Sequence, residues 1–85
     1  MNEKFYLESD INEICQNLKK YSKFVSGKKF LISGANGFLG KYFIKTLITI
    51  NKSLSKKIKI TAIDIKFDKC EIYSDKNVKK IKKDI

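Results

Sequence analysis

Three glycines spaced G-x-x-G-x-x-G are the residues of this chain best suited to chemistry. Gly34, Gly37 and Gly40 follow directly on the apolar run 30–32 and Ser33. In such a motif the first glycine allows a tight turn from strand to helix, the second lets the backbone approach a phosphate, and the third lets the helix pack closely on its strand. The following helix presents free N–H groups and the positive end of its dipole. This pattern indicates a site for a dinucleotide pyrophosphate, formed without a lysine.

The residues around the glycines must supply a strand before the turn and a helix after it. Apolar side chains recur at three- and four-residue intervals over 38–50, which predicts that helix. A second apolar run, 57–64, has strand character and ends in Asp64, about 20 residues beyond the motif, where a dinucleotide-binding fold places its ribose-binding carboxylate. The lysine-rich segment 79–83 predicts a third strand, at a solvated edge of the sheet.

These elements predict an α/β fold, the first half of a Rossmann-type doubly wound parallel sheet. We expect the strands in the order third, second, first, with the helix 38–50 crossing between the first two. About a dozen residues is the minimum length of a parallel crossover, so we expect at most a short helix over 67–77. We also expect the face that carries Phe30 and Ile32 to expose apolar surface, since the other half of the sheet is missing.

The glycine motif and the strand ends resemble the NAD-dependent epimerase/dehydratase family, the extended short-chain dehydrogenase/reductases that act on nucleotide sugars. Segment 33–40 is similar to that family's T-G-x-x-G-F-x-G signature, with Ser33 replacing the threonine. The resemblance runs from Gly27 to Ile85. It implies that the cofactor is bound by residues of the motif and of two strand ends: Gly34, Asn36, Gly37, Phe38, Leu39, Gly40, Asp64, Ile65, Asp84 and Ile85.

The residues at the ends of the second and third strands determine which cofactor we expect. Asp64 and Ile65 match the end of the family's second strand, and Asp84 with Ile85 resembles the pair that holds adenine. A carboxylate at Asp64 accepts two ribose hydroxyl protons but repels a 2′-phosphate, so we expect NAD in preference to NADP.

The family's catalytic residues are not found in this chain. The resemblance implies that bound NAD takes hydride from a nucleotide sugar, while the tyrosine of a Y-x-x-x-K motif removes the hydroxyl proton. None of the four tyrosines is followed by a lysine at that spacing. We therefore expect this chain to be the NAD-binding amino-terminal part of an epimerase or dehydratase, inactive alone.

The length of 85 residues allows one small core. We expect residues 28–85 to be a partial Rossmann domain and residues 1–27 to be a leader. In the leader, Asp10 and Glu13 fit a capping box, and apolar residues recur at helical spacing as far as Tyr21. This predicts one amphipathic helix of about four turns, packed on the flank of the domain, with a role in a homodimer as the alternative.

The net charge of +10 suggests nucleic acid, but the composition argues against it. All 19 basic residues are lysine, whereas arginine is best suited to bidentate phosphate and base contacts. Two cysteines without a histidine do not make a metal site. The amino terminus has acidic residues and no continuous apolar stretch, so we expect no signal peptide. No apolar stretch approaches the roughly 20 residues of a membrane span, and we therefore expect a cytoplasmic protein. A non-catalytic relative that senses a dinucleotide or binds a partner, and a small nucleic-acid-binding protein, are the alternative functions.

Overall fold

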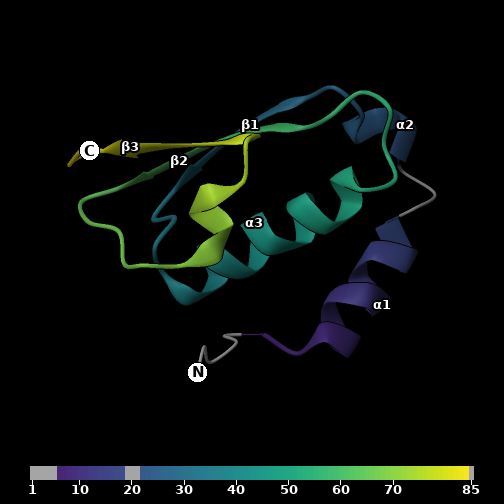
Figure 1. The fold of residues 1–85 in the computed structure, drawn as a ribbon, viewed down its shortest axis with the longest axis horizontal. Coiled ribbons are helices and arrows are strands. Elements are labelled where there is room, and N and C mark those ends of the chain that lie inside the picture. The colour runs from purple at the N-terminus through teal and green to yellow at the C-terminus, as the bar shows by residue number, and fades with distance from the viewer. Residues whose placement is uncertain (1–5, 19–21, 85) are drawn as a thin grey trace.

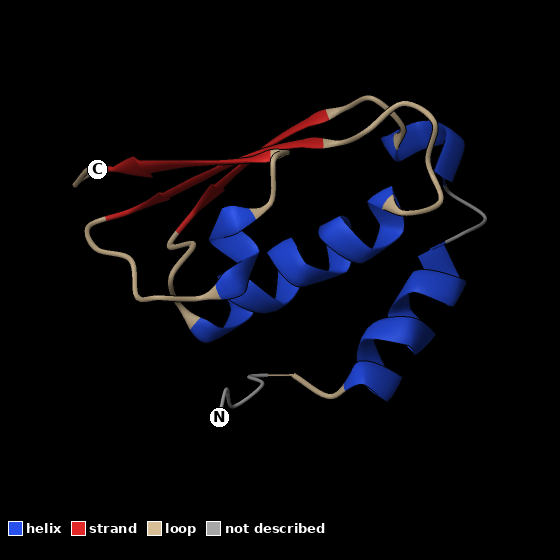
Figure 2. Cartoon of the chain, in the orientation of Figure 1, coloured by secondary structure: helices blue, strands red, loops and turns tan. Residues whose placement is uncertain are grey.

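The protein is a small α/β structure with three parallel strands in an open sheet. The computed structural model describes residues 6–18 and 22–84. In chain order its elements are α1 (Glu8–Leu18), α2 (Ser22–Val25), β1 (Lys29–Ser33), α3 (Phe38–Asn51), β2 (Lys59–Asp64), the 3-10 helix η2 (Glu71–Ser74) and β3 (Val78–Lys82). The strands lie in the order β1-β2-β3 and all pairs are parallel (Figure 2). The predicted strand order and the short helix in the second crossover are confirmed.

The core lies between the sheet and α3, which packs against one face of it (Figure 1). α1 packs in turn on α3, and η2 contacts both α3 and β3. The largest fully buried side chains come from α3, from β2, from the residue before β2 and from η2: Ile44, Ile58, Ile60 and Ile72. This arrangement leaves the opposite face of the sheet without a helix in the described part of the chain (Figure 1).

The alternation of side chains along β1 corrects the expectation about its exposed face. Phe30 and Ile32 are half-buried and pack against the core, and the Phe30 ring meets that of Phe43 edge-on at 5.9 Å. Leu31 points to the opposite face and is 71 % exposed. Successive side chains of a strand point to opposite faces, and because α3 covers the face of Phe30 and Ile32, the apolar side chain left uncovered is Leu31.

The leader helix starts earlier than the capping box predicts. α1 begins at Glu8, so Asp10 lies inside its first turn and is not the N-cap. Acidic side chains in a first turn are stabilised by the helix dipole, which accounts for helix before Asp10. The expected packing on the flank is present, because Ile11 is 2 % exposed and the Cys15 thiol donates to the Thr46 carbonyl oxygen at 3.7 Å. The expected continuation to Tyr21 lies outside the described residues.

In residues 6–18 and 22–84, no helix combines the length and the apolar character needed to cross a membrane.

Candidate functional site

The glycine motif forms a tight turn between β1 and α3. Gly34 has φ +65°, a conformation that side-chain-bearing residues rarely adopt. Gly37 N–H donates to the Gly34 carbonyl oxygen at 3.0 Å, which closes the turn, and Ala35 N–H donates to the Ile63 carbonyl oxygen at 3.1 Å. The turn is thereby fixed to the carboxyl end of β2, the neighbouring strand.

The third glycine is required by the lack of space around it. A Cβ atom on Gly40 would lie 2.6 Å from the Gly34 carbonyl oxygen and 2.8 Å from the Ala35 Cα atom. A Cβ atom on Gly37 would lie 3.3 Å from the Gly34 carbonyl oxygen, which is tight but not prohibitive, and its φ of −75° suits any residue. The fold therefore needs glycine at 34 and 40 and does not require it at 37.

The amino terminus of α3 presents uncapped N–H groups beside this turn. Gly37 is the N-cap and has no side chain to accept from them. Lys41 N–H donates to the Gly37 carbonyl oxygen at 2.9 Å, so the N–H groups of Phe38, Leu39 and Gly40 precede the first hydrogen bond of the helix and have no acceptor within it. The Phe38 and Leu39 side chains are 63 % and 79 % exposed. Three N–H groups and the positive end of the helix dipole are suited to an anion.

Asp64, at the end of β2, lies directly against the glycine turn. Its Oδ2 atom accepts from the Asn36 N–H at 2.8 Å, and its Oδ1 atom accepts from the Ile65 N–H at 2.7 Å. These two hydrogen bonds, the Asn36 bond first, hold the pKa of the carboxyl below its ordinary value. Asp64 therefore stays charged through mildly acidic pH. Each carboxylate oxygen has a second lone pair, which leaves Asp64 able to accept from a ligand.

The ends of all three strands surround an open cavity of about 300 Å³. It is lined by the last residues of β1 and β2, by the first residue of the turn and by the residues that follow β2 and β3: Ser33, Gly34, Ile63, Asp64, Ile65, Lys83 and Asp84. Ile65 is 57 % exposed and Asp84 is exposed, while Lys83 N–H donates to the Asp64 carbonyl oxygen at 2.8 Å. The cavity thus gathers Gly34, Asp64, Ile65 and Asp84 of the predicted site. Ile85 lies outside the described residues.

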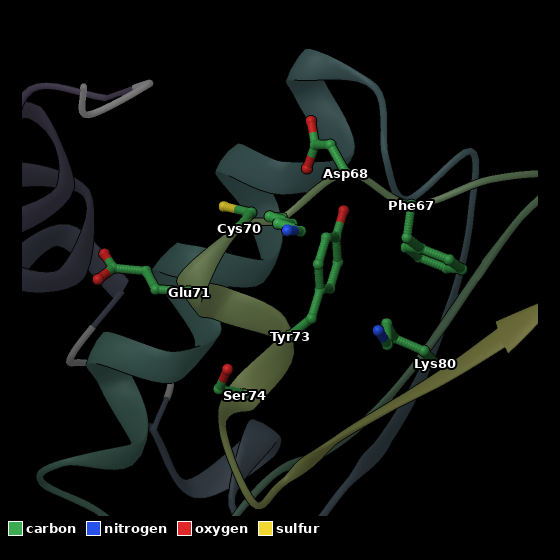
Figure 3. Close-up of a pocket in the computed structure, with 8 residues that line it drawn as sticks. Phe67, Asp68, Cys70, Glu71, Tyr73, Ser74 and Lys80 are labelled. Atoms are coloured by element: carbon green, nitrogen blue, oxygen red, sulfur yellow. The ribbon is translucent and has the colours of Figure 1, made fainter. Parts of the chain in front are cut away.

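Asn36 has a role that the motif does not reveal. Its Oδ1 atom accepts from the Asp68 N–H at 3.1 Å and from the Tyr73 hydroxyl at 2.9 Å, so this side-chain oxygen is used within the protein. Asp68 and Tyr73 belong to the β2–β3 crossover, where they line a hollow of about 510 Å³ (Figure 3). Asp68 also pairs with Lys41 of α3. The sequence carries no spacing signal for these contacts, because they join segments about 30 residues apart.

The chain was compared with protein-family models, with curated protein sequences and with solved structures, and none of the three comparisons gave a match. Within the described ranges, no three His, Cys, Asp or Glu side chains come together to hold a metal ion.

Proposed function

We propose that residues 28–85 bind NAD, with the pyrophosphate at the glycine turn and the adenosine in the cavity at the strand ends. The observation that carries this proposal is the hydrogen bond from Asn36 N–H to Asp64 Oδ2, 2.8 Å long. It joins the middle of the glycine turn to the acid at the end of β2, two features that the sequence predicted separately for the same ligand. A layout like the first half of a Rossmann fold accounts for both.

The residues present fit a dinucleotide in three respects. Gly40 lets α3 begin so close to the turn that a Cβ atom at this position would have no room. The first N–H groups of α3 have no acceptor within the helix, as a pyrophosphate site requires. The Asp64 carboxylate is charged and retains lone pairs for the two hydroxyls of a ribose.

Asp64 also favours NAD over NADP. A 2′-phosphate would replace one hydroxyl donor and place its negative charge beside the carboxylate, where an exposed pair of like charges is repelled. NAD supplies a hydride acceptor when bound. The residues of this chain would bind and orient it, and substrate oxidation would fall to residues outside 28–85.

This assignment makes the chain the cofactor-binding part of a nucleotide-sugar epimerase or dehydratase. The family resemblance of segment 33–40 and of the strand ends supports that enzyme class, and a nucleotide sugar is then the substrate of the complete protein. No Y-x-x-x-K motif occurs within the 85 residues, so binding, and not turnover, is the activity to measure on this polypeptide.

Calorimetric titration of NAD and NADP into the wild-type polypeptide and into Asp64→Asn tests the proposal. We expect NAD to bind the wild type more tightly than NADP. Asp64→Asn should weaken NAD binding by between about ten- and a hundredfold, since hydrogen bonds to a charged acceptor contribute about 1.5–3 kcal/mol. NADP should be affected less, because the substitution also removes a repulsive charge.

Glu13→Gln is the matched control. It removes the same charge from an exposed position on α1 and should leave both affinities unchanged. Absence of NAD binding to the wild type, or an equal response of the two cofactors to Asp64→Asn, would contradict the proposal.

A further inference from the structure

The glycine turn is held from the outside by the crossover that joins β2 to β3. Asn36, in the middle of the turn, makes three hydrogen bonds that leave the turn. Its N–H donates to Asp64, and its Oδ1 atom accepts from the Asp68 N–H and from the Tyr73 hydroxyl. Both lone pairs of Oδ1 are thereby filled. The Asn36 side chain is thus fixed in one position, although the next residue, Gly37, is a glycine.

The Tyr73 side chain is well placed to fix the Asn36 side chain. It is 8 % exposed, and its hydroxyl lies 2.9 Å from Asn36 Oδ1 and 3.2 Å from the Ala35 carbonyl oxygen. A phenol has one proton to donate, and both acceptors within reach belong to the turn. The hydroxyl therefore bonds to the turn whichever acceptor it selects.

The ring of Tyr73 is held by its neighbours on the crossover and on β3. Phe67 meets it edge-on with ring centroids 4.9 Å apart, and the Lys80 ammonium lies 5.8 Å from its centroid (Figure 3). Burial is the main cause that raises the pKa of Tyr73 far above its ordinary value. The charges of the nearby Asp68, Cys70 and Asp64 raise this pKa further. The hydroxyl accordingly keeps its proton, and its capacity to donate, throughout the neutral and mildly alkaline range.

We propose that Tyr73 is a positioning residue for the dinucleotide, because its hydroxyl, acting through Asn36, holds the glycine turn in the binding conformation. This inference rests on the NAD site proposed above. Glycine-containing turns lose much conformational freedom when they become ordered, and a ligand that must order its own site loses affinity. By fixing Asn36, Tyr73 orders the turn before the ligand arrives, and the Asn36–Asp64 hydrogen bond carries the same restraint to the ribose site.

Tyr73→Phe tests this directly, since it removes the hydroxyl and keeps the ring that packs on Phe67. In the free polypeptide we expect amide hydrogen exchange at Asn36 and Gly37 to become between about two- and tenfold faster, the effect of one neutral hydrogen bond. Exchange in α3 and β2 should stay at the wild-type rate. The dissociation constant for NAD, measured by calorimetry, should rise by a similar factor.

Tyr42→Phe is the matched control, because that hydroxyl donates to Asp10 of α1 at 3.3 Å and lies outside the turn. It should change neither the exchange at the turn nor the affinity. Asn36→Ala removes the acceptor instead of the donor. Both substitutions remove the Tyr73–Asn36 hydrogen bond, and Asn36→Ala also removes the acceptor of the Asp68 N–H. Because one bond is shared, their effects on NAD affinity should be less than additive in the double variant Tyr73→Phe/Asn36→Ala.

Wild-type exchange at Asn36 and Gly37 in Tyr73→Phe would overturn the inference, as would faster exchange spread equally over α3 and β2, or fully additive losses in the double variant. The exchange measurement needs no ligand. If the turn loosens as expected while the wild type fails to bind NAD, the restraint by Tyr73 stands and the proposed NAD site is what fails.

Discussion

The three glycines of the motif differ in what the fold requires of them. Gly34 is needed for its backbone conformation, with φ +65° and open space around the position of a Cβ atom. Gly40 is needed because a Cβ atom would overlap the backbone of Gly34 and Ala35. Gly37 is needed by neither criterion. One sequence motif therefore contains two glycines that the fold requires and one, Gly37, that it does not require, and it is this third glycine that the proposed ligand site would need.

Gly40→Ala should destabilise the protein, and Gly37→Ala should do so much less. Overpacking against a backbone that cannot move aside costs about 1–3 kcal/mol. At Gly37 the backbone is already extended and its replacement at an N-cap costs less than about 1 kcal/mol. Urea denaturation of the two variants measures the difference. Equal losses of stability would mean that α3 does not approach the turn as closely as described.

At the scale of elements, the structure is a sheet covered on one face by α3, with α1 packed outside it. Ile11 connects these two helices and is 2 % exposed, although α1 otherwise carries mostly polar, exposed side chains. The apolar side of α1 is thus covered by α3 of the same chain. α1 thus contributes to the stability of the domain from a position remote from the glycine turn.

Ile11→Ala should lower the free energy of unfolding by about 2–5 kcal/mol, the usual range for a buried Ile. Glu13→Ala, on the exposed side of the same helix, should change it by less than about 0.5 kcal/mol. Urea denaturation of both variants measures these values. A negligible effect of Ile11→Ala would show that α1 is not packed on α3 in solution.

The strand, turn and helix at 30–50 could be predicted from the sequence because each depends on local pattern: apolar runs, glycines and three- to four-residue periodicity. The position of Asp64 followed from the length of one βαβ unit. The bonds of Tyr73 and Asp68 to Asn36 could not be predicted, since they depend on how the second crossover folds back over the turn. The exposed face of β1 was predicted wrongly, because strand alternation does not say which face a helix will cover.

At the scale of the whole molecule, the two edges of the sheet differ in character. β3 forms one edge and carries Lys79, Lys80 and Lys82, which discourage pairing with another strand. β1 forms the other edge, and its central side chain, Leu31, is 71 % exposed. The exposed lysines of β3 and the free N–H groups at the start of α3 are thus two different features to which an anion can be attracted.

Binding of NAD to Gly37→Val, compared with the double variant Lys79→Gln/Lys82→Gln of exposed β3 lysines at fixed salt, tests the central claim most directly. The φ of −75° at Gly37 suits valine, although its Cβ atom would lie a tight 3.3 Å from the Gly34 carbonyl oxygen. Its side chain is expected to occupy the proposed ligand space, and thermal unfolding checks that the variant is folded. The proposed site predicts at least about a 100-fold loss of NAD affinity, or ~2.7 kcal/mol, for Gly37→Val and little change for the lysine pair. Loss of binding in the lysine variant with wild-type affinity in Gly37→Val would show that the anion is held by general electrostatic attraction and that the glycine turn is not a nucleotide site.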